Sequence, residues 1–201
     1  MKEALAFFGA FNPPTLAHLD LAGYALEKTN AKRVLFVPSK SAYIRDFQLK
    51  DHAYGDGERL VMLRRAAEKR PWMEVTDIEI RAEAQPRTYE TLCRLRQKGT
   101  EASLLVGSDK LAEMGKSWAF VTEIAREFGI VVLTRGADEC GRMIRESALL
   151  SSLASCIRVL ETPEETRNIS STAVRERVAR IRELEKEISQ MVPEEILSLL
   201  Y

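Results

Sequence analysis

The sequence has little of what marks several common classes of protein. Its 201 residues carry 30 basic and 30 acidic side chains and no formal net charge, so no whole-chain field favours nucleic acid or a membrane surface. No apolar run approaches the roughly 20 residues that a membrane-spanning helix needs, and the first residues lack the pattern of a signal peptide. We therefore expect a cytoplasmic protein without nucleic-acid or membrane partners.

Metal-binding and redox residues are also scarce. Two histidines offer little for a zinc site, and the three cysteines (Cys93, Cys140 and Cys156) are odd in number and widely spaced. This usage indicates reduced, packed thiols. The chain has neither Gly-x-Gly-x-x-Gly nor a Gly-Lys-Ser/Thr loop, so it lacks the fingerprints of Rossmann dinucleotide binding and of P-loop hydrolysis.

Apolar segments alternate between strand and helix along most of the chain. Short apolar runs bounded by turn residues predict strands, and apolar residues at helical spacing predict helices. The predicted strands are 5–8, 32–38, 73–80, 102–106, 130–133 and 156–160, and the predicted helices are 58–69, 88–96, 118–128, most of 138–153 and 193–200, with further helices starting near 15 and running through 174–181. This order implies an α/β fold with a largely parallel sheet and helices on both faces. We expect one domain over 1–201, with a helical C-terminal portion at about 163–201.

The stretch Leu5 to Leu21 joins the first strand to the first helix through Gly9 and the pair Pro13-Pro14. Such a turn lies where open parallel sheets usually bind ligands and where helix amides attract phosphate. Thr15 and His18 share one face of the first helical turn, so the segment is a candidate triphosphate site. The alternative is that Thr15 is only an N-cap and His18 a core histidine.

A second candidate anion site lies late in the chain. Ser170, Ser171 and Thr172 stand at a helix start, with Arg175 in the first turn. Amides, hydroxyls and a fixed cation could together hold one anion. Taken alone, the same residues are more typical of an N-cap followed by a solvated basic face.

Two further segments suggest a nucleotide partner. Asp109 follows the fourth strand and could accept hydrogen bonds from a ribose, Trp118 could stack on a planar heterocycle, and Thr88 begins a helix. Asp109 could instead cap a helix and Trp118 fill the core.

The segment 39–57, with Lys40 and Arg45, is long enough to be a functional loop or lid.

The segments at the two ends of the chain resemble signatures of the nucleotidyltransferase superfamily. Residues 9–18 are similar to Gly-x-Phe-x-Pro-x-(His/Thr)-x-Gly-His, and residues 169–175 to Ile-Ser-Ser-Thr-x-(Ile/Val)-Arg. Within the superfamily the chain resembles the bacterial nicotinate-nucleotide adenylyltransferases over nearly its whole length. The further matching features are Val37-Pro38, Arg59 with Met62-Leu63, 88–92, 107–111 followed by Trp118, and 192–195.

The resemblance implies a Rossmann-like, doubly wound sheet and transfer of AMP from ATP to nicotinate mononucleotide. The mononucleotide phosphate would attack the α-phosphorus in line, and pyrophosphate would leave with the Mg²⁺ carried by ATP. No protein side chain would hold the metal. By matching position, the catalytic residues would be Thr15, His18 and Arg175, and the ATP-binding residues Gly9, Phe11, Asn12, His18, Ser171, Thr172 and Arg175. The pyridine nucleotide would be bound by Thr88, Asp109 and Trp118, and Lys40 or Arg45 could close over the phosphates.

Two positions depart from the family pattern. Thr15 stands where this branch usually has histidine, and Ala17 where it usually has glycine. They leave open an adenylyltransferase with another acceptor, such as nicotinamide mononucleotide or phosphopantetheine, or a degenerate protein that binds a nucleotide without turnover. A homo-oligomer is possible, and the sequence does not choose between oligomeric states.

Overall fold

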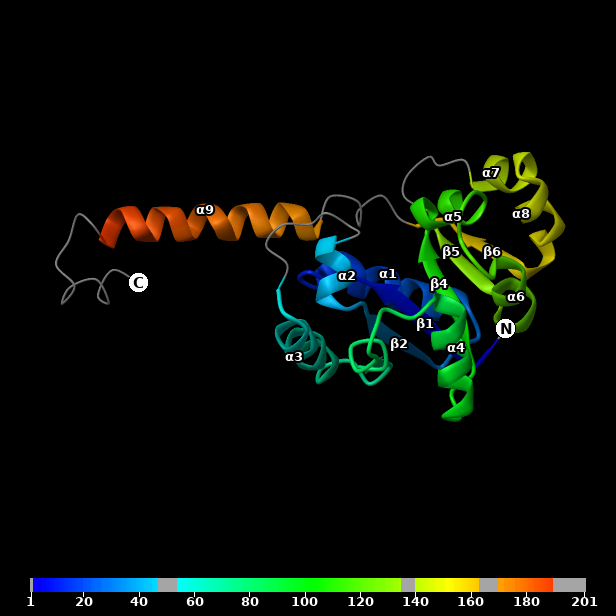
Figure 1. Cartoon of the computed structure of the whole chain (residues 1–201), viewed down its shortest axis with the longest axis horizontal. Coiled ribbons are helices and arrows are strands. Elements are labelled where there is room, and N and C mark those ends of the chain that lie inside the picture. The colour runs from blue at the N-terminus through cyan, green and yellow to red at the C-terminus, as the bar shows by residue number, and fades with distance from the viewer. Residues whose placement is uncertain (1, 47–53, 135–139, 163–169, 190–201) are drawn as a thin grey trace.

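A six-stranded, wholly parallel sheet forms the centre of the protein (Figure 1). The computed structural model describes residues 2–46, 54–134, 140–162 and 170–189. The strand order is β3-β2-β1-β4-β5-β6, which reverses direction between β1 and β4, as in a doubly wound Rossmann-like fold. The strands are β1 Ala4–Gly9, β2 Arg33–Pro38, β3 Met73–Val75, β4 Ala102–Gly107, β5 Ile130–Leu133 and β6 Ile157–Leu160.

Helices cover both faces of the sheet, as predicted. They are α1 Leu16–Lys28, α2 Ser41–Asp46, α3 Asp56–Ala67, α4 Thr88–Gln97, α5 Ser108–Met114, α6 Val121–Glu123, α7 Cys140–Glu146, α8 Ala148–Ser152 and α9 Ser171–Ser189. Ile124–Phe128 is a π-helical turn after α6, and Ala154–Cys156 is a short 3₁₀ turn. Residues of α1 and α3 join one core layer, and residues of α4 to α8 join the other. Figure 1 shows α9 leading away from the sheet.

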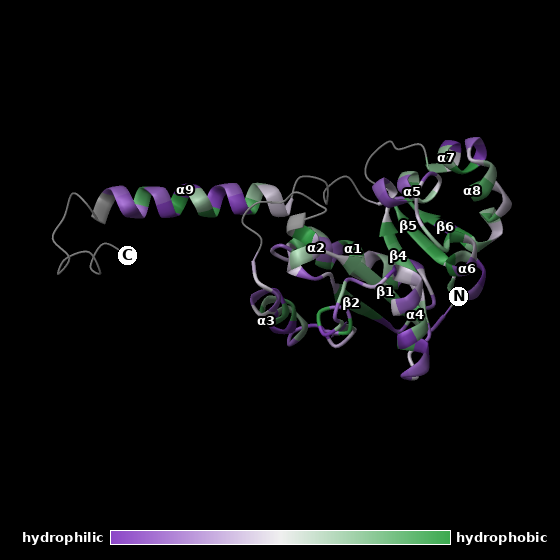
Figure 2. Cartoon of the chain, viewed as in Figure 1, coloured by the Kyte–Doolittle hydropathy of each residue, from purple (hydrophilic) through white to green (hydrophobic). Residues whose placement is uncertain are grey.

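Alternate residues of each central strand enter opposite core layers. In β1, Ala4 and Ala6 face the layer of α4 to α8, whereas Leu5 and Phe7 face the layer of α1 and α3. Successive side chains of a strand point to opposite faces, and a parallel sheet is covered on both, so its strands are apolar without a break. Figure 2 shows the strands as a hydrophobic layer between helices whose outer faces are hydrophilic.

Some element boundaries differ from the sequence-based prediction. The third strand ends at Val75 rather than at residue 80, because the backbone turns there: Arg81 donates to the carbonyl of Asp77 and Ala82 to that of Glu79. The segment 39–57 contains α2, a helix that the sequence reasoning missed. The predicted 138–153 helix is two helices, and Ser147 caps the second by accepting from the N–H of Leu150. The helix predicted at 193–200 lies outside the described residues.

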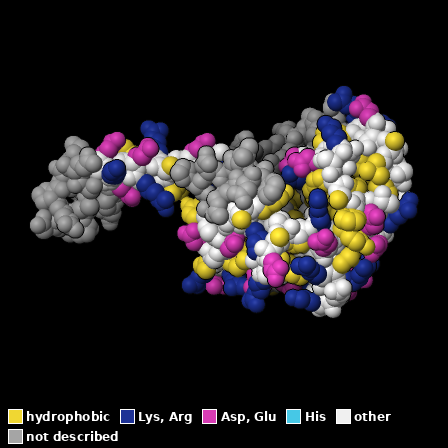
Figure 3. Space-filling model, viewed as in Figure 1, with side chains coloured by type: hydrophobic (Ala, Val, Ile, Leu, Met, Phe, Trp, Pro, Cys, Tyr) yellow, Lys and Arg dark blue, Asp and Glu magenta, His cyan; other side chains and the backbone are white. Residues whose placement is uncertain are grey.

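The described surface and thiols agree with the composition. None of the three cysteines forms a disulfide within the described residues, and Cys140 is buried while the other two are half-buried, in agreement with packed thiols. Basic and acidic side chains are interspersed on the face in Figure 3. Within the ranges that the structure covers, no helix has the length and apolar character to cross a bilayer.

The sheet's central strand provides a test of the core. Leu104 of β4 has no exposed surface, so Leu104→Ala should lower the free energy of unfolding by about 2–5 kcal/mol through lost burial and the cavity left behind. Urea denaturation measures this. Val61→Ala, at a side chain that is 58% exposed on α3, is the matched control and should change stability by no more than about 0.5 kcal/mol. Equal losses of unfolding free energy in the two variants would contradict the placement of Leu104 in the core.

Candidate active site

The ends of β1 and β4 place the predicted site segments at one edge of the sheet. The two strands pair in parallel, with Phe7 opposite Leu105. Their carboxyl ends, Gly9 and Gly107, therefore lead into neighbouring segments: the turn before α1 and the start of α5. This is the topological switch point, where open α/β sheets bind ligands.

The turn after β1 is buried and conformationally strained. Phe11 has φ +44°, a left-handed conformation that costs a residue with a side chain about 1–2 kcal/mol. Its ring is 1% exposed and packs against Phe7 and Phe36, at centroid distances of 5.5 and 5.2 Å. A Cβ at Gly9 would lie 3.0 Å from this ring. Gly9 and Phe11, both predicted to bind ATP, therefore determine the shape of the turn itself.

His18 is oriented by Thr15. Thr15 is the N-cap of α1, and its backbone N–H donates to Nδ1 of His18 at 3.1 Å, while its Oγ1 lies 2.7 Å from the same atom. A backbone N–H can only donate, so Nδ1 offers its lone pair, and in the neutral ring Nε2 carries the proton. The imidazole also packs edge-on against Phe11, 5.2 Å between centroids. The N-cap and the oriented histidine are thus both present, and Nε2–H is the ring's donor.

The late signature is docked on this turn. Ser171 Oγ donates to the carbonyl of Pro13 at 2.8 Å, and Arg175 Nη1 donates to the carbonyl of Asn12 at 2.6 Å. A second guanidinium nitrogen donates to Oγ1 of Thr172 at 3.2 Å. The first turn of α9 and the turn after β1 therefore meet, although they stand at opposite ends of the chain.

Asn12 has an unsatisfied donor. Its Oδ1 accepts from the N–H of Tyr54 at 2.8 Å, but its Nδ2 is buried and has no hydrogen-bond partner among the described residues. Leaving a buried donor unpaired costs roughly 1–3 kcal/mol. A ligand that accepts a hydrogen bond there would remove this cost.

The three residues predicted to bind the pyridine nucleotide come from the α4 to α8 side of the sheet. Thr88 is the first residue of α4 and is half-buried, and Asp109 is exposed in the first turn of α5. Trp118 follows α5, packs partly against the core, and donates from Nε1 to Glu113 Oε2 at 3.3 Å. Its indole therefore combines the two roles considered from the sequence, partial core packing and an accessible ring surface.

The two cations proposed as a phosphate lid are placed differently. The Lys40 ammonium donates to the carbonyls of Ile80, at 3.0 Å, and Ala82. A role at a phosphate would require it to leave these carbonyls. Arg45 lies in α2, and its side chain is outside the described part of the structure.

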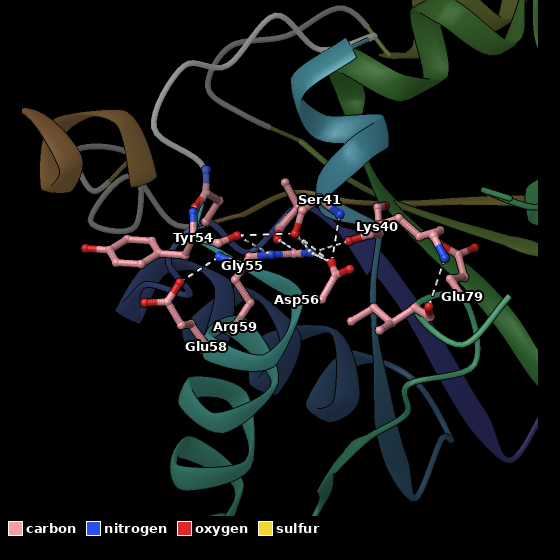
Figure 4. A network of polar contacts seen from close by, with 12 residues as sticks. Lys40, Ser41, Tyr54, Gly55, Asp56, Glu58, Arg59 and Glu79 are labelled. Atoms are coloured by element: carbon pink, nitrogen blue, oxygen red, sulfur yellow. Dashed lines mark hydrogen bonds and ion pairs between the residues drawn. The ribbon is translucent and has the colours of Figure 1, made fainter. Parts of the chain in front are cut away.

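Arg59 is a residue of this region that the sequence reasoning did not place in the site. It lies in α3 and has no exposed surface. Its guanidinium donates to Ala10 O at 2.6 Å and, on the loop side, to Ser39 O, Tyr54 O and Asp56 Oδ1 (Figure 4). Burial opposes ionisation of Asp56, but hydrogen bonds from Ser41 and the charge of Arg59 hold the pKa of its carboxyl below the usual range. In the sequence, the family resemblance at Arg59 was the one feature that could have indicated its place in the site.

Glu79 belongs to the neighbouring polar network. It is 2% exposed and accepts from Gln85 Nε2 at 2.5 Å and Thr91 Oγ1 at 2.8 Å. Gln85 in turn accepts from the backbone N–H of Lys40. Burial raises the pKa of Glu79 to about 7, although these hydrogen bonds oppose the shift. No group of three or more His, Cys, Asp or Glu side chains that could hold a metal is found within the described ranges.

Comparison with known proteins agrees with this arrangement. Residues 6–177 match the family model described as cytidylyltransferase-like. The chain belongs to this family. It is accordingly a nucleotidyltransferase, with the Rossmann-like fold and two end signatures that the sequence predicted.

Similar proteins within the family carry a more specific name. A probable nicotinate-nucleotide adenylyltransferase from Caldicellulosiruptor bescii is 30% identical over 192 residues, covering 96% of this chain and 92% of the relative. One from Aquifex aeolicus is 35% identical over 133 residues, covering 65% and 76%. Plasmodium falciparum nicotinic acid mononucleotide adenylyltransferase, solved with APC and with NaAD, has a TM-score of 0.66 at 15% identity and covers 88% of this chain and 83% of that one. At 15% sequence identity, this structural similarity shows that the two proteins share a fold.

Glu79 should make stability depend on pH. Its pKa rises from 4.5 to about 7 on folding, so between these values the folded chain keeps a proton that the unfolded chain has lost. Stability should therefore fall as pH rises through this window, by on the order of 3 kcal/mol in total. Glu79→Gln should abolish this component in urea denaturation at pH 5 and pH 8, whereas Glu83→Gln, at an exposed carboxyl, should not. If Glu79→Gln kept the pH dependence of the wild type, Glu79 would not be the group whose pKa is raised on folding.

Proposed function

We infer that the protein is a nicotinate-nucleotide adenylyltransferase, which transfers AMP from ATP to nicotinate mononucleotide and releases pyrophosphate. The contact between the two ends of the chain carries this inference. Ser171 and Arg175 donate to the carbonyls of Pro13 and Asn12, which brings two helix N-termini, a histidine and an arginine to one turn. The curated relative that is 30% identical over 96% of the chain bears this name.

The ATP phosphates would lie at the amino end of α1. Helix N-terminal amides attract anions, and Nε2–H of His18 would donate to a phosphate oxygen. The first turn of α9, with Ser171, Thr172 and Arg175, would face the pyrophosphate that leaves. Mg²⁺ carried by ATP would neutralise part of the charge on these phosphates.

The reaction requires the protein to position the two substrates and to stabilise the charge that develops on the leaving group. The attacking phosphate of the mononucleotide is already ionised, so no strong general base is required. The new P–O bond forms at the α-phosphorus as the bond to pyrophosphate breaks on the opposite side, and negative charge grows on the leaving group. Fixed donors that need no reorganisation, such as an oriented His18 and an anchored Arg175, stabilise that charge.

The mononucleotide would occupy the other side of the switch point. Asp109 and Thr88 would hydrogen-bond the ribose and its surroundings, and Trp118 would stack on the pyridine ring. Trp118 is half-buried and its indole N–H is held by Glu113, so the ring is presented in a restrained orientation.

The substitutions at two family positions are compatible with activity. Thr15 replaces a histidine, yet its N–H and hydroxyl both lie at hydrogen-bond distance from Nδ1 of His18, so it maintains the orientation of the remaining imidazole. Ala17 is 6% exposed, and its methyl group packs inside the protein. Both side chains are therefore accommodated by the fold without loss of the His18 orientation.

The activity is tested with pure protein, ATP, Mg²⁺ and nicotinate mononucleotide. We expect dinucleotide and pyrophosphate to form in equal amounts. His18→Ala should lower kcat by about 10²–10³-fold, because a donor to the transition state is lost, whereas Asp20→Asn, at an exposed position on the same helix, should stay within about twofold. Turnover with only nicotinamide mononucleotide or phosphopantetheine would show that the protein uses that acceptor instead of nicotinate mononucleotide. No turnover with any of these three acceptors would overturn the inference.

Trp118 is tested separately through KM. Trp118→Ala should raise KM for the mononucleotide about tenfold, as expected for loss of a stacking contact worth roughly 1.4 kcal/mol, and leave KM for ATP nearly unchanged. Trp118→Phe keeps an aromatic face and should retain most of the affinity. If Trp118→Ala raises both KM values equally, the residue does not contact the pyridine ring specifically.

A further inference from the structure

The strained residue Phe11 is held on both sides by arginines. The carbonyl of Ala10, immediately before it, accepts from Arg59 Nη1 at 2.6 Å, and the carbonyl of Asn12, immediately after it, accepts from Arg175 Nη1 at 2.6 Å. A left-handed conformation of a bulky residue persists only where the surroundings over-determine it. These two charge-assisted hydrogen bonds provide that constraint.

Arg59 also holds this turn by a second route. It donates to the carbonyl of Tyr54 at 3.2 Å, and the N–H of Tyr54 donates to Oδ1 of Asn12 at 2.8 Å. The guanidinium has no exposed surface, and Asp56 balances its charge at 2.6 Å (Figure 4). Arg59 thus reaches both residues that flank Phe11, Ala10 directly and Asn12 through the backbone of Tyr54.

The conformation of Phe11 determines the surroundings of His18. The two rings meet edge to face, 5.2 Å between centroids and 69° between planes. On its other side the imidazole is held by Thr15 through Nδ1. If Phe11 left its position, His18 would lose one of these two supports.

We propose that Arg59 is a positioning residue for adenylyl transfer, which acts through Phe11 to hold the His18 imidazole in its working orientation. The proposal rests on the function inferred above. In this arrangement Arg59 contacts no substrate, and its effect on the reaction passes through the turn. Lysine cannot replace it, because a single ammonium on a flexible stem does not reproduce a planar fork that contacts several carbonyls at once.

A double-mutant cycle tests the pathway. Arg59→Lys should lower kcat about 10- to 100-fold and change KM for the mononucleotide by less than about threefold. In a His18→Ala background the same change should lower kcat by less than about threefold, because the group it positions is gone. Arg65→Lys, on the same helix at a side chain that is 76% exposed, is the matched control and should have no effect in either background. Equal losses from Arg59→Lys in the two backgrounds would overturn the proposal.

Imidazole ¹⁵N spectra give a readout that does not depend on turnover. The chain has two histidines, so the His18→Ala spectrum assigns His18. We expect an acceptor Nδ1 and a protonated Nε2 in the wild type, a shift of these signals in Arg59→Lys, and none in Arg65→Lys. Unchanged His18 signals in a folded Arg59→Lys protein would overturn the proposal. An inactive wild type would overturn the proposed function, and the spectra would still decide the role of Arg59.

A second variant covers the case in which Arg59→Lys does not fold. Phe11→Leu keeps an apolar side chain but removes the ring that packs on His18. It should lower kcat in the wild-type background, shift the His18 signals, and have little effect on kcat in the His18→Ala background. Additive losses, or unchanged His18 signals, would show that the ring does not transmit the effect.

Discussion

Hydrogen bonds from buried or anchored guanidinium groups to main-chain carbonyls hold the turn after β1, and the candidate site depends on that turn. Ala10 and Asn12 each accept from an arginine, and the strained Phe11 lies between them. The turn sets the position of the His18 ring, receives the first turn of α9, and carries the unsatisfied amide of Asn12. Although the chain has no net charge, two of its arginines, Arg59 and Arg175, converge on this turn.

The parallel sheet explains why this place is the site. Because all six strands run the same way, every strand delivers its following segment to the same edge, and the strand order reverses between β1 and β4, where open α/β sheets bind ligands. The residues proposed to face the ATP phosphates, Thr15 and His18, follow β1, and two of those proposed to bind the mononucleotide, Asp109 and Trp118, follow β4. The two substrates of an adenylyl transfer can therefore approach one another from two sides of the switch point.

The accuracy of the sequence-based prediction varied with the range of the interactions involved. Central strands were located to within a residue or two, because apolar runs such as 130–133 reflect burial on both faces. The third strand was drawn too long, since the apolar spacing of Val75, Ile78 and Ile80 continues into a turn defined by backbone hydrogen bonds of Asp77 and Glu79. Helix α2 was missed because its six residues are too few to show a helical period.

By itself, the sequence determined the α/β order, the Gly9 turn and the two end signatures, because these are local patterns of residue type and spacing. Only the tertiary structure decided that the signatures touch, through Arg175 on Asn12, and that Lys40 lies on the carbonyls of Ile80 and Ala82. It also decided that Arg59 is fully buried. Its charge is balanced by Asp56 of the same helix, and its other partners, such as the carbonyls of Ala10 and Ser39, come from distant segments. Such convergence leaves no periodic trace in the chain.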